Sequence, residues 1–203
     1  MTGGPAGFTA LEVDGDYDGL ELRGLDLSGQ RGSQARFLDC EMHDCRLDDV
    51  QLRRARIGDT VLTDLRSVSL DVADSAWRDC VVRGSRIGAF VAPGATMTRL
   101  HVVGGKIDFV NLRGAHLVDV TFEGCRLGDV DCSRADLTRV AFPGCQVERL
   151  DVSSARLAEV DLSRAELHEL SGLAQLAGAV ISQGQLADLA PAFATHLGVR
   201  VVP

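Results

Sequence analysis

Large apolar side chains occupy every fifth position of this chain from Leu22 to Leu167, with four exceptions among thirty positions. The exceptions are Gly32, Ser67, Ala92 and Cys132. A period of five fits neither the period of an α-helix, about 3.6 residues, nor the period of a strand, about two residues. The pattern therefore indicates an internal repeat, and such a repeat largely determines the architecture.

Each five-residue unit is typical of a short strand followed by a corner. The residue two places before the apolar centre is small or apolar, and the residue between them is usually polar, as in Ala135-Asp136-Leu137. This inward, outward, inward alternation predicts extended chain. The last two residues of each unit are rich in Gly, Ser, Asp and Arg, which suits a turn.

A longer period gives the number of sides. Small residues recur two places before the centre at every twentieth position: Ala35, Ala55, Ser75, Ala95, Ala115, Ala135 and Ala155. Four units therefore complete one coil, and equivalent residues stack on one another. The sequence predicts a square parallel β-solenoid of about seven coils.

These units resemble those of the pentapeptide repeat family, and Ala135-Asp136-Leu137-Thr138-Arg139 is a close copy of the family's unit. The resemblance extends over about three quarters of the chain. It implies an all-β solenoid, specifically a right-handed quadrilateral parallel β-helix, and the handedness follows from the resemblance alone.

Three segments are expected. Residues 1–19 form an N-terminal capping segment, in which residues 8–13 suit a short strand and Tyr17 is a possible extra centre. Residues 20–170 form the β-helix, and residues 171–203 form a C-terminal helical cap or dimerisation segment. In the last segment Ser182 and Gln185 have the spacing of a capping box. A helical stripe follows, made of Leu186, Leu189, Phe193 and Leu197.

This terminal helix can act as a lid over the last coil. It also resembles the segment through which some bacterial pentapeptide repeat proteins dimerise, so we expect a homodimer. The two roles are compatible.

The sequence offers no evident catalytic chemistry. By their register all six cysteines point inward, and the five histidines are scattered. A rod without long insertions provides no cleft. We therefore expect no enzymatic activity, no cofactor and no bound metal. The chain has neither an apolar run long enough to span a membrane nor a basic, apolar start, which predicts a cytoplasmic location without membrane contact.

Charge divides the chain into bands. The net charge is −8, with four acids and no base in residues 1–19. Residues 115–169 hold eleven acids and six bases, whereas residues 80–114 hold five bases and one acid. Summed by side, the repeat region has net charges of −3, −2, +1 and 0, so no side is a continuous acidic stripe.

The acidic band suggests one kind of partner. By resemblance, one group of family members protects topoisomerases: an acidic rod, often a dimer, imitates the DNA duplex on gyrase. The sequence therefore suggests a dimeric DNA mimic that binds DNA gyrase, or another type II topoisomerase, and contributes to antibiotic resistance. It would not bind nucleic acid directly. The candidate partner-binding acids are Asp129, Asp131, Asp136, Asp151, Glu159 and Asp161.

The basic band suggests an alternative. Val81, Val103 and Phe109 fall at outward or corner positions where the repeat normally has polar residues. Exposed apolar groups ringed by bases can mark a partner site, whereas a local bulge would bury them. The alternative functions are therefore a scaffold for an unrelated protein partner and a purely structural role.

Overall fold

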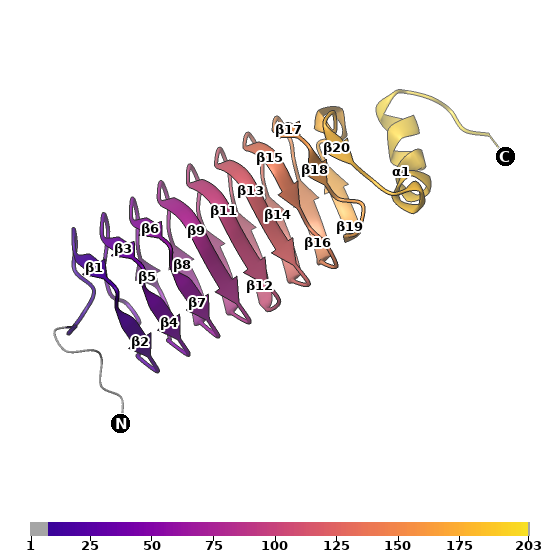
Figure 1. Ribbon diagram of the computed structural model, residues 1–203. Helices are drawn as coiled ribbons and strands as arrows, with labels where there is room; N and C mark the ends of the chain where they lie inside the picture. The colour runs from indigo at the N-terminus through magenta and orange to yellow at the C-terminus, as the bar shows by residue number, and fades with distance from the viewer. Residues whose placement is uncertain (1–7, 203) are drawn as a thin grey trace.

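The structure is a computed structural model that describes residues 8–202. It is an elongated rod of stacked turns with one helix beyond its C-terminal end (Figure 1). Each full turn uses twenty residues, because strands pair in parallel with strands twenty residues later, as in Asp16 with Arg36 and Arg126 with Gln146. The last pair, Asp161 with Val180, is offset by nineteen. The predicted square β-solenoid is confirmed.

The four sides are numbered here in chain order. The first side begins with β1 (Asp16–Asp18), β3 (Arg36–Leu38) and β6 (Arg56–Gly58), and the second with β2 (Glu21–Arg23), β4 (Glu41–His43) and β7 (Val61–Thr63). Longer strands then run along both of these sides: β9 (Ala76–Arg83), β11 (Thr96–Val103), β13 (His116–Glu123) and β15 (Asp136–Ala141). Short strands complete the two sides: β17 (Arg156–Ala158), β18 (Val160–Asp161) and β20 (Ala179–Val180).

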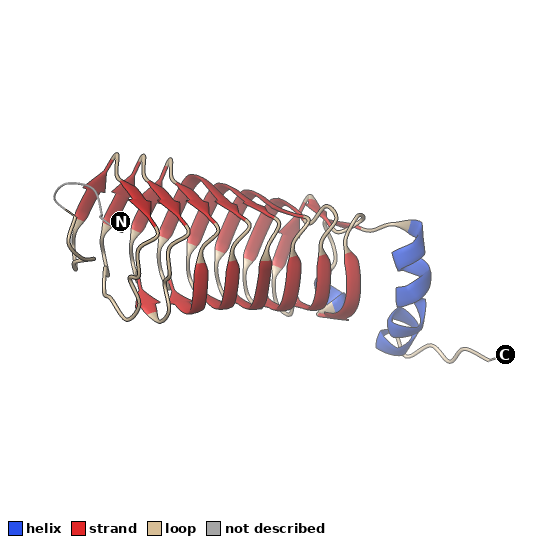
Figure 2. Ribbon diagram, turned by 90° about the horizontal axis from the view of Figure 1, so that it is seen from below, coloured by secondary structure: helices blue, strands red, loops and turns tan. Residues whose placement is uncertain are grey.

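The third and fourth sides form a separate seven-stranded sheet. Its strands are β5 (Val50–Gln51), β8 (Arg66–Asp71), β10 (Arg86–Val91), β12 (Lys106–Asn111), β14 (Arg126–Asp131), β16 (Gln146–Asp151) and β19 (Glu166–Ser171). Figure 2 shows these strands as successive rungs of the rod.

The rod has about eight turns, one more than the pattern from Leu22 onward gives. The extra turn begins at β1, where Tyr17 is a buried centre that pairs with Phe37 in the same register. The Tyr17 and Phe37 rings stack with their centroids 4.8 Å apart. Tyr17 is therefore the extra centre that the sequence suggested.

The inward positions fill the rod completely. Leu117, Val120 and Ala115 have no exposed surface, and all six cysteines are buried as the register predicts. Within the described residues, no buried side-chain nitrogen or oxygen lacks a hydrogen-bond partner. The core is thus one continuous apolar column, since each rung covers the rung before it.

Most corners depend on a left-handed residue two places after the centre, whereas the later corners between the third and fourth sides, as at Phe109, lie within continuous strands. Gly84, Gly104 and Gly124 have φ between +60° and +62°, and many equivalent positions hold Asp, as at Asp39 (φ +51°). Gly and Asp tolerate this conformation better than most residues. This explains the enrichment in Gly and Asp at the end of each unit.

Two of the four exceptions to the apolar series have visible causes. A Cβ on Gly32 would lie 2.9 Å from Leu52 Cδ2 and 3.5 Å from Leu11 Cβ, so this glycine leaves room for the N-terminal cap. Ser67 is buried, and its hydroxyl donates a hydrogen bond of 2.6 Å to the Leu47 carbonyl.

The N-terminal cap is not the predicted strand. Residues 8–13 have no regular secondary structure, and residues 1–7 of the predicted capping segment lie outside the described part. Leu11 is buried, its amide donates to Gln30 Oε1, and the Glu12 amide donates to the Tyr17 hydroxyl. Because side-chain oxygens accept the hydrogen bonds of these two amides, the segment covers the first turn without pairing with it as a strand.

The C-terminal end is covered mainly by the chain before the helix. The 3₁₀ helix η1 (Leu173–Gln175) and β20 follow the last full turn, and Leu176, Ala179 and Ile181 pack against the core. The helix α1 (Gln183–His196) has no buried residue and stands beyond the rod in Figures 1 and 2. It is therefore not the lid expected from the sequence.

The start of α1 agrees with the sequence. The predicted capping box is present: Ser182 Oγ accepts from the Gln185 amide, and Gln185 Oε1 accepts from the Ser182 amide. Gln185 Nε2 also donates to the carbonyls of Leu162 and Ala165, which ties the start of the helix to the last turn. Residues 199–202 continue without secondary structure.

Substitution of Leu117 by alanine tests the packing of the core. Leu117→Ala leaves a cavity between two covered rungs, so we expect a loss of about 2–5 kcal/mol in the free energy of unfolding. Equilibrium urea denaturation measures it. The outward Thr138→Ala variant is the control and should change stability by less than about 0.5 kcal/mol. Equal effects for the two variants would contradict the inward register.

Candidate functional site

The six acids proposed for partner binding do not form one surface. Asp136 lies on the first side, Asp161 on the second, and Asp131 and Asp151 on the fourth. Glu159 lies at the corner after the first side, and Asp129 lies at the corner after the third side. The structure brings only Asp131 and Asp151 together, as partners on neighbouring rungs.

Several of these acids already have cationic partners. Asp136 lies 2.6 Å from Arg156 Nε and 3.0 Å from His116 Nδ1. The hydrogen bond from Arg156 is the main cause of the lowered pKa of Asp136. Arg113 Nε lies 2.7 Å from Asp131. These arginines offset part of the negative charge on this half of the rod.

Other acids shape the corners. Asp131, Asp151 and Asp161 each accept a hydrogen bond from the amide two residues later, at 2.8–2.9 Å. Burial opposes ionisation of Asp131, but hydrogen bonds from Ser133 and the ion pair with Arg113 outweigh it and lower its pKa. The side-chain hydrogen bond from Ser163 similarly lowers the pKa of Asp161. These carboxylates therefore have a structural use.

The apolar residues of the basic band also separate. Val81 in β9 and Val103 in β11 lie on the second side, whereas Phe109 in β12 lies at the corner after the third side. All three are half-buried. They form two different surfaces.

Opposite charges commonly pair from rung to rung. On the first side Arg36 Nη1 lies 2.8 Å from Asp16, and two arginines at its corner make two-pronged contacts: Arg99 with Asp79, and Arg139 with Asp119. On the third side Arg149 Nε lies 2.9 Å from Glu169. Charges of opposite sign on adjacent strands stabilise a sheet.

One column departs most strongly from this pattern. On the third side, five bases stack on consecutive rungs at intervals of twenty residues: Arg46, Arg66, Arg86, Lys106 and Arg126. We call them the basic column. All five side chains are exposed. No other outward column of the described solenoid holds more than three consecutive charges of one sign.

The basic column was not recognised in the sequence, although the twenty-residue period contains it. The net charge of a whole side does not reveal the basic column, because acids in the two neighbouring columns of that side cancel part of its positive charge. Asp48 lies 2.5 Å from Arg46 Nε, and Asp108 lies 2.6 Å from Lys106 Nζ. Comparing residues n and n+20 position by position reveals the column.

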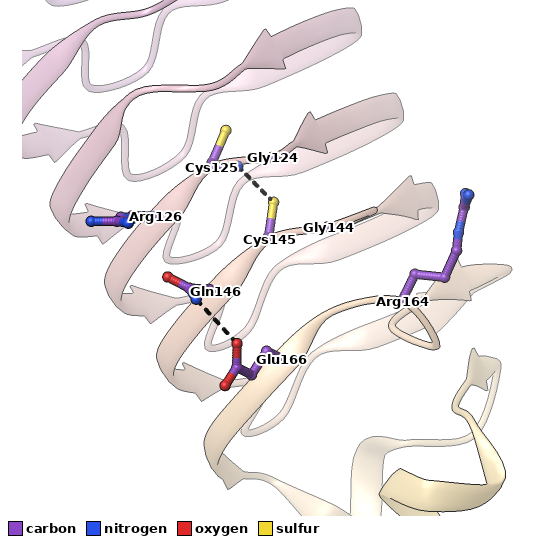
Figure 3. Close-up of a pocket in the computed structure, with 8 residues that line it drawn as sticks. All are labelled: Gly124, Cys125, Arg126, Gly144, Cys145, Gln146, Arg164 and Glu166. Carbon is purple, nitrogen blue, oxygen red and sulfur yellow. Dashed lines mark hydrogen bonds between the residues drawn. The ribbon is translucent and has the colours of Figure 1, made fainter.

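Open hollows accompany these surfaces. One, of about 400 Å³, lies at the corner between the second and third sides and is shown in Figure 3. Gly124 and Gly144 leave it open, Gln146 Nε2 donates to Glu166 across its side, and Arg164 points away from it. The hollow is open to solvent.

The cysteine pair Cys125 and Cys145 lies behind this hollow. The Cys125 amide donates to Cys145 Sγ at 3.4 Å, as their stacking on adjacent rungs predicts. Contact with Cys145, together with burial, raises the pKa of Cys125. Burial raises the pKa of Cys132 to about 12. The raised pKa values of Cys125 and Cys132 favour the thiol form, which is a poor nucleophile and a poor metal ligand. The hydrogen bond with Cys125 instead lowers the pKa of Cys145, which is itself buried.

One group of donor atoms has the spacing of a metal site. Single donor atoms of Glu21, Glu41 and His43 lie within 4.8 Å of one another on the second side. His43 Nε2 is 3.0 Å from Glu41, and this contact is the main cause of the lowered pKa of Glu41. Glu21 forms an ion pair with Arg23. A metal ion would therefore have to compete with the arginine.

The residues proposed for dimerisation lie along α1 and just beyond it. Leu189 and Phe193 are half-buried, whereas Leu186 and Leu197 are 51% and 73% exposed. With Val180, Val199, Val201 and Val202, this end carries six of the eight exposed large hydrophobic residues of the described chain. Most exposed large hydrophobic side chains of the described part therefore lie at the C-terminal end.

The fold and its surfaces define a class: a quadrilateral β-solenoid with long exposed sides. Residues 107–144 match the family model of pentapeptide repeats in 8 copies. The chain therefore carries pentapeptide repeats, as the resemblance implied, and the same register continues on both sides of the matched segment. A search of curated proteins gives no match.

Comparison with solved structures gives distant likenesses. QnrB1, described as a plasmid-mediated fluoroquinolone resistance protein, is 18% identical over 91% of this chain and 96% of its own, with a TM-score of 0.49. HetL of the cyanobacterium Nostoc, described as involved in heterocyst differentiation regulation, is 17% identical over 84% and 91%, with a TM-score of 0.28.

A thiol titration tests the burial of the cysteines. Because the six thiols are buried, we expect little reaction with a thiol-specific reagent at pH 8 in the native protein. All six should react after unfolding in guanidinium chloride. Rapid reaction of one or more thiols in the folded protein, at the rate of a free thiol, would contradict their inward placement.

Proposed function

We propose that the protein is a non-enzymatic rod that acts by binding a protein partner along its sides. The observation that carries this proposal is the register itself: about eight turns repeat without a long insertion and present rigid columns of side chains. The hollows in these sides are open to solvent. Such a surface suits a macromolecule better than a small substrate.

For the partner we propose a type II topoisomerase such as DNA gyrase, bound through the acidic half of the rod. Support comes from the excess of eleven acids over six bases in residues 115–169 and from the family resemblance. A mimic of DNA must present negative charge where the enzyme receives phosphates. The side-chain pairing described above limits the acids available for this.

Asp129, Asp151 and Glu159 are the strongest candidates among the six acids. Asp129 has only a long contact with an arginine, Arg149 Nη1 at 3.9 Å. Asp151 and Glu159 have no ion pair within the described residues. Asp131 and Asp136, in contrast, are held by close arginines and should contribute less.

A gyrase assay tests this partner. The purified protein should inhibit DNA supercoiling by gyrase, or relieve its inhibition by a quinolone, at micromolar concentration. Asp129→Asn combined with Glu159→Gln removes two negative charges without changing side-chain size, so we expect about a tenfold weaker effect. Agarose-gel supercoiling assays measure it.

The matched control removes two exposed acids from the other half, Asp39→Asn with Asp59→Asn. It should retain the activity of the unmodified protein. Absence of any effect of the unmodified protein on gyrase would remove the topoisomerase from the proposal. Equal losses in the two variants would mean that net charge acts without a defined surface.

We also propose that two copies associate through the C-terminal segment. The exposed apolar side chains at this end support it, because large apolar patches are rare on monomeric proteins. Two joined C-terminal ends would bring two acidic bands together at the middle of a longer rod. This arrangement would extend the negative surface offered to a DNA-binding enzyme.

Light scattering tests the association. Leu189→Asp with Phe193→Asp places two charges on the proposed interface, so the mass should fall from that of a dimer to that of a monomer. Thr195→Asp combined with Asp188→Asn is a control that leaves these apolar residues in place. A dimeric mass in the Leu189→Asp, Phe193→Asp variant would exclude this interface.

A further inference from the structure

The basic column is costly for folding. Arg66, Arg86 and Lys106 occupy directly paired positions on adjacent strands, and like charges at such positions destabilise a sheet. On other columns the same chain places Asp79 beside Arg99 and Asp119 beside Arg139. The basic column therefore lacks the pairing of opposite charges that stabilises several other columns. Such exceptions are expected at functional surfaces.

Two members of the column have no ion pair within the described residues, namely Arg86 and Arg126. Arg66 has only a contact of 3.7 Å with Asp44, and both side chains are about 70% exposed. The centre of the column therefore offers cationic groups to a partner, with little competition from acids of the same chain.

A short apolar strip lies beside the centre of the column, between Asp48 and Asp108 at the same position of earlier and later rungs. Val68 is 64% exposed, and among the exposed large hydrophobic residues it is the one in the repeat rungs before the C-terminal cap. Gly88 follows it on the next rung, where a Cβ would lie 2.4 Å from the Val68 carbonyl oxygen. Ala89 and Phe109, paired on neighbouring rungs, border the strip at the corner.

We infer that this side binds an amphipathic α-helix of a partner protein, with an acidic stripe on the basic column and an apolar stripe on the Val68–Phe109 strip. The inference rests on the proposed role as a protein-binding rod and names a second surface for it. It does not depend on the topoisomerase.

Spacing favours a helix over an extended peptide. Rungs are about 4.8 Å apart, and acids one turn apart on a helix rise by about 5.4 Å. Over the four intervals of the column, the rise of the helix and the length of the column differ by about 2.4 Å, which long arginine side chains can accommodate. Acids on one face of an extended strand are about 6.8 Å apart, so the mismatch grows to about 8 Å.

Nucleic acid fits this surface less well. The whole chain has a net charge of −8, which repels a polyanion at long range. Single-stranded nucleic acid also needs aromatic side chains on which its bases stack. Along the basic column and the strip beside it, Phe109 is the aromatic residue, and it is half-buried. An acidic helix needs fewer charges and supplies its own apolar contacts.

A binding experiment with a designed peptide tests the inference. The probe is a fluorescent helical peptide of about five turns, with glutamates at i, i+4, i+7 and i+11 and leucines beside them. Fluorescence anisotropy should show saturable binding at low salt that weakens about tenfold when salt is raised to about 0.5 M. A scrambled peptide of the same composition should bind at least about tenfold more weakly.

The key variant is Arg86→Glu. It should weaken peptide binding about tenfold, and it should also raise the melting temperature by about 1–3 °C, because Glu would lie between Arg66 and Lys106. A rise in stability with a loss of binding distinguishes a functional column from a structural one. The control is Arg56→Glu on the opposite side, which makes the same change in charge and should leave binding unchanged.

Three results would overturn the inference. They are equal binding of the scrambled peptide, tighter binding of an oligothymidylate of about twenty nucleotides, and unchanged binding by Arg86→Glu. Gyrase inhibition by Arg86→Glu should equal that of the unmodified protein. The two proposals therefore fail separately, since a failed gyrase assay leaves the peptide result intact.

Discussion

The structure depends on parallel backbone hydrogen bonding between residue n and residue n+20. This register stacks Asp16 on Arg36 at one end of the rod and Gln146 on Glu166 at the other. It explains why inward positions accept apolar or small residues, why most corners use a left-handed residue, and why the surface is organised as columns. In a rod of this kind, the same repeat determines both the buried and the exposed positions.

The fold could be predicted from the sequence because the repeat is local and regular. The inward cysteines, the extra centre at Tyr17 and the capping box at Ser182 all follow from the period or from short-range pattern. The ends were less predictable. Residues 8–13 use the side chains of Gln30 and Tyr17 for their amides, and such contacts over many residues leave no periodic signal.

The surfaces were predictable only in part. Net charge located an acidic half, but the structure shows Asp131 and Asp136 paired with arginines and Asp151 used in a corner. Those contacts depend on the direction of each side chain, and the net charge of a segment gives no information about that direction. The basic column was present in the sequence at intervals of twenty, yet it becomes evident only when each outward column is followed separately.

The fixed register also has a consequence for how such a rod can change. Insertion of twenty residues adds one turn and leaves every later residue on its own side. Loss of a single five-residue unit, in contrast, moves every later outward residue by one quarter of the circumference. The core could survive such a deletion, because each unit supplies the same kind of inward side chains. The basic column would be broken at that point, and its two parts would face different directions.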